Sequence, residues 1–393
     1  MDHAIAVDVP SPGGRLEQAG LLALFGIAGG VLFSIAVAQI LLALAAVCWA
    51  AIVITRHERV AVPAFFWPLL AYGGWTLLSA ALSPDPRVSL IDCKQLLLFL
   101  LVPIVYRFAT GQRATTLVTV ILSCAAISAA FGIFQYAILH YDNLGQRPQG
   151  TLGHYMTYSG LLMLVLAAAL GRILFGRGER TWAAAVLPAL AVAIAVTFTR
   201  SAAVGACAAA AMLLALKDFR LLAVLPIVAA IFLALAPGAL SARFVNMFSL
   251  KDPSSRDRLA MLREGQHMIR AHPLFGVGPN MVEVVYSEYR DPDAVQRVNP
   301  HLHNVPMQIA AERGLPALGL WLWFIGSLSF ALVKRVPHGH VRFLAASALA
   351  AIAAMLAAGM FEYNFGDSEF LMMFLILVTL PFASERTDTP AES

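Results

Sequence analysis

The hydrophobic pattern of this chain is a succession of long apolar runs separated by short polar stretches. Runs of about 17–25 residues are long enough for a helix to cross the hydrocarbon core of a bilayer. We therefore predict about twelve membrane-spanning helices. They cover approximately residues 17–33, 35–54, 64–82, 92–106, 115–138, 153–174, 182–198, 202–216, 219–236, 306–332, 341–360 and 368–384.

The first two runs are nearly continuous from Ala19 to Thr55, which is too long for one tilted helix. Gly29, Gly30 and Ser34 lie in the middle of this stretch and predict a tight turn between two spans. Without that turn there would be one span fewer, and every later loop would face the opposite side of the membrane.

One long hydrophilic segment interrupts the apolar pattern. The chain is thereby divided into nine predicted spans, the hydrophilic segment, three further spans and a short tail, at residues 1–236, 237–305, 306–384 and 385–393. Within the segment, residues 254–275 place Leu259, Leu262, Met268 and Ile269 at helical spacing. The segment is therefore expected to contain an amphipathic helix with one apolar face.

Composition indicates an all-α polytopic membrane protein. Hydrophobic residues make up 60% of the 393 residues and charged residues only 13%, which is typical of a chain that lies mostly within a bilayer. The residues before Ala19 form no cleavable-signal pattern, and no nucleic-acid-binding motif is present. Cys48, Cys93, Cys124 and Cys207 lie in or beside apolar runs without CxxC spacing, so we expect neither a disulfide nor a zinc site.

The basic residues favour one orientation of the chain. With the N-terminus inside, the short inner loops hold twelve basic residues: Arg56, Arg59, Arg107, Arg113, Arg172, Arg177, Arg180, Lys217, Arg220, Lys334, Arg335 and Arg342. The short outer loops hold four: Arg87, Lys94, Arg147 and Arg200. By the positive-inside rule, segment 237–305 then lies outside, in the periplasm if the chain occupies a bacterial inner membrane, and the C-terminal tail lies inside.

Arginines on the predicted amphipathic helix are candidate phosphate-binding residues. Arg256, Arg258, Arg263 and Arg270 cannot share one face at about 100° per residue, so only some of them can point at a common site. A planar guanidinium holds two phosphate oxygens at once and stays charged at any usable pH. The alternative is a helix that lies on the membrane surface with its arginines on phospholipid headgroups.

A histidine pair lies at the end of the hydrophilic segment, directly before the next apolar helix. His301 and His303 offer a neutral base near pH 7, and Asn304 could orient a ring or bind a sugar hydroxyl. Arg200 joins two spans almost without a loop, so its charge is expected at the outer interface. The alternatives are two solvated histidines and an arginine that only anchors its helix.

Further polar groups are predicted on the outer side. Arg147 precedes His154 and Tyr155 in a glycine-rich stretch. Residues between the last two spans are candidate partners for the arginines: Glu362, Asn364, Asp367 and Glu369. Asp291 and Asp293 flank a proline and resemble the acidic pair of a divalent-metal site, but this composition is also ordinary for a turn, and we expect no metal there.

Four stretches of the sequence together resemble the O-antigen ligase/polymerase superfamily, and within it the O-antigen ligases. They are Gly150 to Tyr155, Thr197 to Ser201, Arg258 through His272-Pro273 to Gly278, and His303-Asn304 through Gln308 to Glu312, Gly314, Leu315 and Pro316. Each stretch is a weak signal alone, but the four occur in the order of the family. The glycines at 276 and 278, taken by themselves, predict a turn that leaves the amphipathic helix.

The resemblance implies a fold and a reaction. The fold is the C-type glycosyltransferase (GT-C) architecture, with a large periplasmic loop. The reaction, in lipopolysaccharide biosynthesis, transfers a polysaccharide from undecaprenyl pyrophosphate to a sugar of the lipid A core, without a metal or other cofactor. Carried over residue by residue, Arg200 and Arg258 hold the pyrophosphate and His303 acts on the acceptor hydroxyl. The remaining candidate substrate-binding residues are Arg147, His154, Tyr155, Arg263, His301 and Asn304.

Other functions stay open at this stage. An O-antigen polymerase would use the same donor with a second lipid-linked glycan as acceptor, and a protein O-oligosaccharyltransferase is a further relative. A transporter or flippase would be expected to show repeated halves and charges at mid-membrane, whereas most charges here fall in loops. A structural scaffold would leave Arg200 and the histidine pair without a common role.

Overall fold

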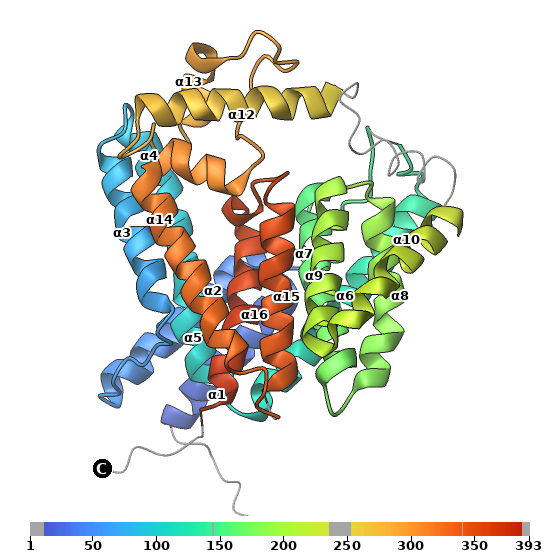
Figure 1. Cartoon of the computed structure of the whole chain (residues 1–393). Coiled ribbons are helices and arrows are strands. Elements are labelled where there is room, and N and C mark those ends of the chain that lie inside the picture. Colours follow the sequence, from blue (N-terminus) through green and yellow to red (C-terminus); the bar gives the residue numbers. More distant parts are fainter. Residues whose placement is uncertain (1–11, 144, 236–252, 340, 387–393) are drawn as a thin grey trace, which may run out of the picture.

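The computed structural model describes residues 12–143, 145–235, 253–339 and 341–386, which form an all-helical fold without a β-strand (Figure 1). The helices of the first part are α1 (Pro12–Gly30), α2 (Ile35–Thr55), α3 (Phe66–Ala81), α4 (Pro86–Asp92), η1 (Cys93–Leu100), α5 (Leu101–Phe108), α6 (Gln112–Ala137), α7 (Tyr155–Phe175), α8 (Arg180–Val196), α9 (Arg200–Lys217), η2 (Phe219–Ala223) and α10 (Val224–Leu235). The second part contains α12 (Pro253–Ala271), α13 (Val282–Tyr289), α14 (Val305–Val333), α15 (Arg342–Ala358), η4 (Asn364–Gly366) and α16 (Ser368–Ser384).

The long apolar helices support a multi-pass membrane protein. Six helices of the described chain are long and apolar enough to cross a membrane by length and composition: Ile35–Thr55, Pro86–Phe108, Gln112–Ala137, Tyr155–Phe175, Arg200–Lys217 and Val305–Val333. Three shorter apolar helices, α8, α15 and α16, have 17 residues each. Every predicted span overlaps a helix, but the total of about twelve crossings stays a prediction.

The turn predicted within the first long apolar run is present. α1 ends at Gly30, and α2 begins at Ile35 after Ser34. The Ser34 side chain accepts a hydrogen bond from the Val37 N–H at 3.4 Å, which satisfies a donor that the first turn of a helix leaves open. The two helices then pack against each other.

Helix α16 forms the centre of the bundle and packs on α5, α7 and α15 (Figure 1). All of its residues from Phe370 to Ala383 are buried. Trp67, Trp323 and Phe330, by contrast, are exposed on other helices. A helix that is apolar on every side needs helices around it, whereas apolar residues on the outside of a bundle suit a lipid environment.

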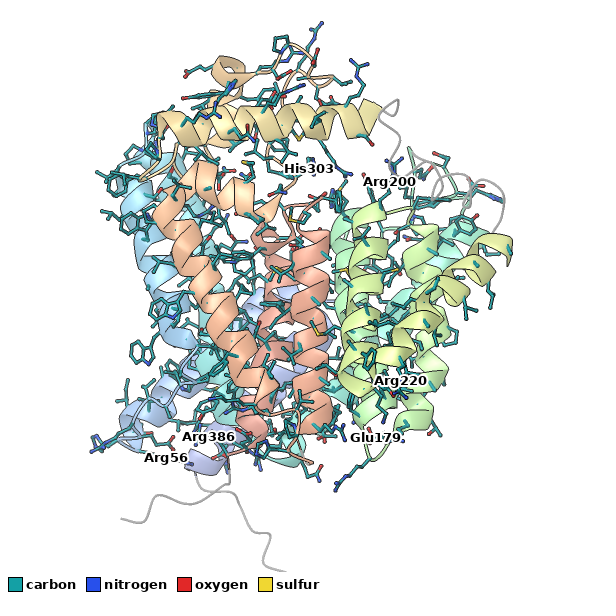
Figure 2. All side chains as sticks on the ribbon, in the orientation of Figure 1. Arg56, Glu179, Arg200, Arg220, His303 and Arg386 are labelled. Carbon is teal, nitrogen blue, oxygen red and sulfur yellow. The ribbon has the colours of Figure 1, made fainter. Side chains whose placement is uncertain are left out.

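The two ends of the bundle differ. α12 lies across one end, which we call the outer end (Figure 1). Arg56, Glu179 and Arg386 lie at the opposite, inner end (Figure 2), where Arg56 forms an ion pair with Glu17 at 3.3 Å. The beginning and the end of the described chain therefore lie on the side opposite α12, as the predicted orientation requires.

The buried face of α12 differs from the predicted one. Met268 is buried as expected, but Leu259 is 45% exposed, and Asp257 and Glu264 are buried instead. Both carboxylates accept hydrogen bonds from backbone N–H groups of residues 291–296, at 2.8 to 3.0 Å. The reason is that the following segment folds back over α12, and its buried backbone donors need acceptors.

Candidate active site

The turn that carries the histidine pair is fixed by the start of α14. The Asn304 side chain caps this helix by accepting a hydrogen bond from the Met307 N–H at 2.9 Å, and its amide donates to the Met360 carbonyl at 3.2 Å. Leu302 is buried between the two histidines, and its N–H donates to the Gln308 side chain at 2.6 Å. These contacts hold the backbone on both sides of His303, which has a positive φ of 49°.

One carboxylate joins the two histidines. Glu362 accepts from Nδ1 of His303 at 2.9 Å and from Nε2 of His301 at 3.1 Å. Burial acts to raise the pKa of Glu362, but the hydrogen bonds from the histidines outweigh it and hold the pKa well below its usual range. Because an ionised carboxylate only accepts, each ring donates to it, and the second nitrogen of each neutral ring stays available as a base.

The sequence did not predict this role for Glu362. It was expected among the acidic residues that pair with arginines, whereas the structure pairs it with His301 and His303. The carboxylate lies 59 residues after His303 in the chain, in the connection between α15 and α16. The only sequence signal was its predicted location on the same side of the membrane.

The first of two adjoining cavities brings the predicted catalytic residues together. It has a volume of about 220 Å³ and is lined by Arg200, Val204, Ser255, Arg258, Leu259, Leu262, Leu302, His303, Asn304, Met360 and Phe361. We call it the arginine cavity. Arg200 comes from the start of α9, Arg258 from α12 and His303 from the turn before α14. Figure 2 shows His303 and Arg200 on the same side of the bundle, under α12.

A tight connection between α8 and α9 places Arg200 at this cavity. Phe198 adopts a positive φ of 54°, and the Thr197 hydroxyl donates to the Ile194 carbonyl at 2.6 Å. α9 begins directly afterwards, so Arg200 projects from its first turn at the outer end. The Arg200 guanidinium donates to the Ser255 hydroxyl at 3.4 Å, which links α9 to the start of α12.

The second cavity includes Glu362 in its own lining. It has a volume of about 200 Å³ and is lined by His154, Met156, Thr157, Gly160, Met163, Ser201, Ala202, His301, Ala358, Glu362, Tyr363, Asn364, Gly366, Asp367 and Phe370. We call it the polar cavity. Its described lining contains no arginine or lysine, but it contains hydroxyl, amide and carboxylate groups. Thr157 donates to Asp367, and Thr157 also lies 3.3 Å from His154 Nδ1.

Three predicted substrate-binding residues do not line either cavity. Arg147 stacks on the ring of Tyr155 at 4.3 Å, beside the polar cavity residue His154. Arg263 forms ion pairs with Asp291 at 2.8 Å and with Asp293 at 3.1 Å. The two aspartates considered as a metal site are therefore engaged by an arginine on the far side of α12.

The glycine-containing turn after α12 docks into a kink of α14. The Gly278 N–H donates to the Glu312 carbonyl, and the Leu315 N–H donates to the Pro273 carbonyl, both at 2.8 Å. Gly314 interrupts α14 with φ 81° and ψ 170°, and a side-chain carbon at this position would overlap the backbone of the turn. This glycine motif therefore does more than end α12, because it fixes the helix that carries Arg258.

The histidine pair and Glu362 also meet the simplest requirement for a metal site. Their potential ligand atoms all lie within 4.8 Å of one another, and two imidazoles with a carboxylate are a donor set that zinc accepts. The two nitrogen-to-oxygen distances also fit ordinary hydrogen bonds. The same geometry is therefore that of a carboxylate that orients two rings, and the absence of a metal stays a prediction.

Comparison with known proteins finds a family match that covers part of the site. Residues 184–322 match the protein family described as O-antigen ligase. The matched segment includes Arg200, Arg258, His301 and His303, and ends before Glu362. No curated protein matches the chain.

Proposed function

We propose, from the membership of this chain in the O-antigen ligase/polymerase superfamily, that it is an O-antigen ligase. It transfers a polysaccharide from undecaprenyl pyrophosphate to a sugar hydroxyl of the lipid A core. The proposed setting is the periplasmic face of a bacterial inner membrane, in a GT-C architecture. The observation that carries the proposal is the convergence of Arg200, Arg258 and His303 on one cavity from three separate elements.

The arginine cavity suits the pyrophosphate of a lipid-linked donor. Arg200 and Arg258 supply guanidinium groups that are already in place before charge develops on the leaving group. Preorganised donors of this kind contribute more than donors that must reorganise during the reaction. Val204, Leu259 and Leu262 line the same cavity and give it an apolar wall, which suits the first part of a polyprenyl chain.

His303 is the proposed general base. Its Nδ1–H donates to Glu362, so its Nε2 accepts the proton of the acceptor hydroxyl as that oxygen attacks the anomeric carbon. The bond from that carbon to the pyrophosphate oxygen breaks, and the arginines stabilise the departing charge. A single displacement of this kind inverts the configuration at the anomeric carbon, and it requires no metal ion.

The polar cavity is the proposed place for glycan hydroxyls. Carboxylate, hydroxyl and amide groups, here from Asp367, Thr157 and Asn364, are suited to bind sugars, and the described lining offers no arginine or lysine for a phosphate. Glu362 binds His301, which lines the polar cavity, and His303, which lines the arginine cavity. The ring centres of the two histidines lie 4.2 Å apart. His301 therefore remains the rival base, since it faces the polar cavity.

A reconstituted transfer reaction tests the proposal. Purified protein in detergent is combined with undecaprenyl-pyrophosphate-linked O-antigen and core-only lipopolysaccharide, with and without EDTA. The products are then separated on a gel. We expect a new lipopolysaccharide ladder that survives EDTA, disappears with His303→Ala and becomes weaker with His301→Ala. His267→Ala is the matched control, because His267 is exposed on α12 and lines neither cavity.

Each contrary outcome has a distinct meaning. Lengthening of the lipid-linked glycan while the core stays bare would identify a polymerase. Loss of the ladder in EDTA, restored by a divalent metal, would assign His301, His303 and Glu362 to an ion. A greater loss with His301→Ala than with His303→Ala would move the role of the base, and a retained anomeric configuration would exclude single displacement. No change in either glycan would favour a transporter.

A further inference from the structure

A third cavity lies at the inner end of the bundle, far from the proposed active site. It has a volume of about 640 Å³ and is lined by Val62, Pro63, Ala64, Phe65, Trp67, Pro68, Tyr106, Trp323, Ser327, Ala331, Arg335, Phe382, Glu385 and Arg386. We call it the inner cavity. α14 begins beside His303 and ends just before Arg335, so the two sites are separated by roughly 40 Å of helix.

The inner cavity combines aromatic walls with two arginines. Trp67 and Trp323 are 62% and 56% exposed, so both present their rings to the surroundings of the bundle. Tryptophan is enriched where a membrane meets water, because its ring is apolar and its N–H is polar. Trp323, on α14, lies three turns before Arg335, so one edge of the cavity runs from apolar to charged along a single helix.

The two arginines are held in place but retain hydrogen-bonding capacity. Arg335 forms an ion pair with Glu385 at 2.9 Å and donates to the Ala331 carbonyl at 2.9 Å. Arg386 donates to the Tyr106 carbonyl at 3.1 Å and lies over the ring of that tyrosine. A guanidinium has five N–H donors, and the bonds among the described residues use two on Arg335 and one on Arg386.

We propose that the inner cavity binds the phosphate headgroup of an anionic phospholipid from the inner leaflet. With two arginines and one glutamate, the lining has a net charge of 2 − 1 = +1. Basic pockets between helices on this side of a membrane are suited to anionic headgroups. The phosphate contacts Arg335 and Arg386, while an acyl chain leaves the cavity past Trp323 into the bilayer. This site does not depend on the proposed ligase activity.

The volume of the inner cavity and the ion pair of Glu385 add two expectations to the proposal. The cavity lies within the range of about 300–1,000 Å³ that small-molecule sites occupy, which suits a headgroup whose chains stay in the membrane. Glu385 competes with the phosphate for Arg335, so the native affinity is lower than two arginines alone would give. Removing this carboxylate should therefore tighten lipid binding, whereas removing an arginine should weaken it.

Native mass spectrometry of the purified full-length protein tests the site. The protein is titrated with dioleoyl phosphatidylglycerol or dioleoyl phosphatidylcholine, and the bound lipid is counted. We expect preferential retention of phosphatidylglycerol, which excess inorganic phosphate does not displace. Arg386→Gln should weaken this binding by about tenfold, because a charged hydrogen bond is lost, and Glu385→Gln should strengthen it.

Lys334→Gln is the matched control for the loss of a positive charge. Lys334 precedes Arg335 directly, but it lies over the ring of Phe330 at 4.2 Å and does not line the cavity. Its replacement should leave the affinity for phosphatidylglycerol unchanged. Equal retention of the two lipids would overturn the proposal, and so would an equal effect of Lys334→Gln and Arg386→Gln. If Arg386→Gln fails to fold, weaker binding by Glu385→Gln would still overturn it.

Discussion

Two cavities lined by arginines lie at opposite ends of the bundle, and they differ in where a nearby carboxylate is bound. At the outer end, Glu362 is bound to the histidines, and His303 shares the arginine cavity with Arg200 (Figure 2). At the inner end, Glu385 is bound to Arg335 inside the cavity itself. We propose a phosphate group as the ligand of both cavities, and of the two only the outer one combines the arginines with a histidine that a carboxylate orients.

The difference between the two cavities shows that binding an anion and catalysing a transfer require different groups. Arginines alone make a site for phosphate, whether it belongs to a substrate or to a membrane lipid. Transfer additionally needs a group that removes a proton, and this group must present an unprotonated nitrogen to the acceptor. The position of one carboxylate, on a histidine or on an arginine, therefore decides which chemistry each cavity supports.

Among the variants that compare the two cavities, the largest expected effect comes from replacing an arginine of the outer cavity. Arg200→Gln should lower the turnover of glycan transfer by about a hundredfold to a thousandfold, because the leaving pyrophosphate loses a preorganised donor. Arg335→Gln should leave turnover unchanged. Initial rates from the gel assay measure both variants. Equal losses would show that the two cavities do not differ in function as we propose.

The next effect tests whether the outer carboxylate orients the base. Glu362→Gln should lower turnover by about a hundredfold, because the amide can donate to Nδ1 of His303 and so favour a proton on Nε2. Glu385→Gln should transfer glycan at the native rate. A Glu362→Gln variant with native turnover would show that His303 needs no such partner.

Glu362→Gln should also change how the stability of the protein depends on pH. The folded pKa of Glu362 lies below its usual value of about 4.5, so its ionised form stabilises the fold above that pH. The contribution is lost as the pH falls below 4.5 towards the folded pKa. The melting temperature of the native protein should therefore exceed that of Glu362→Gln at pH 6, and the two should converge on acidification.

The contrast between Glu362 and the apolar helices shows what sequence can predict here. The extent of a helix depends on apolar residues close together in the chain, so Gly30 and Ser34 mark a turn that the structure contains. Local motifs predicted Arg200 and His303 as site residues, and the structure places both at the arginine cavity, while their roles stay predictions. The bond between His303 and Glu362, in contrast, joins residues far apart in the chain, and no periodicity encodes that contact.

The prediction of which residues of α12 are buried was wrong in part, for a related reason. Spacing identified an amphipathic helix, but a later segment covers part of it, so Asp257 and Glu264 are buried as acceptors for that segment. Arg263 could not be separated from Arg258 by sequence alone, since only the fold shows that Asp291 and Asp293 engage it. Which polar groups meet is set by tertiary packing in both cases.

A smaller effect tests how the outer cavity is assembled. Gly314→Ala should destabilise the protein by about 1–3 kcal/mol from its backbone conformation alone, and the overlap with the turn after α12 adds to this. Turnover should fall as Arg258 moves, while phosphatidylglycerol binding at the inner end persists. Gly319→Ala, with open space at the same helix, is the control. Thermal unfolding in detergent measures both variants, and equal melting temperatures would contradict the docking role.

The smallest expected effect concerns an ion pair at the inner end that lines no cavity named here. Arg107 binds Glu58 through two hydrogen bonds, at 2.8 and 3.0 Å, and these bonds lower the pKa of Glu58. Glu58 and Arg107 lie at the surface but are only partly exposed, so solvent screens the pair and Glu58→Gln should reduce stability by about 1 kcal/mol or less. The loss should be present above pH 4.5, disappear on acidification and shrink in high salt. Unfolding curves at two salt concentrations measure it, and native turnover in this variant would confirm that ion pairs at the inner end serve stability and not transfer.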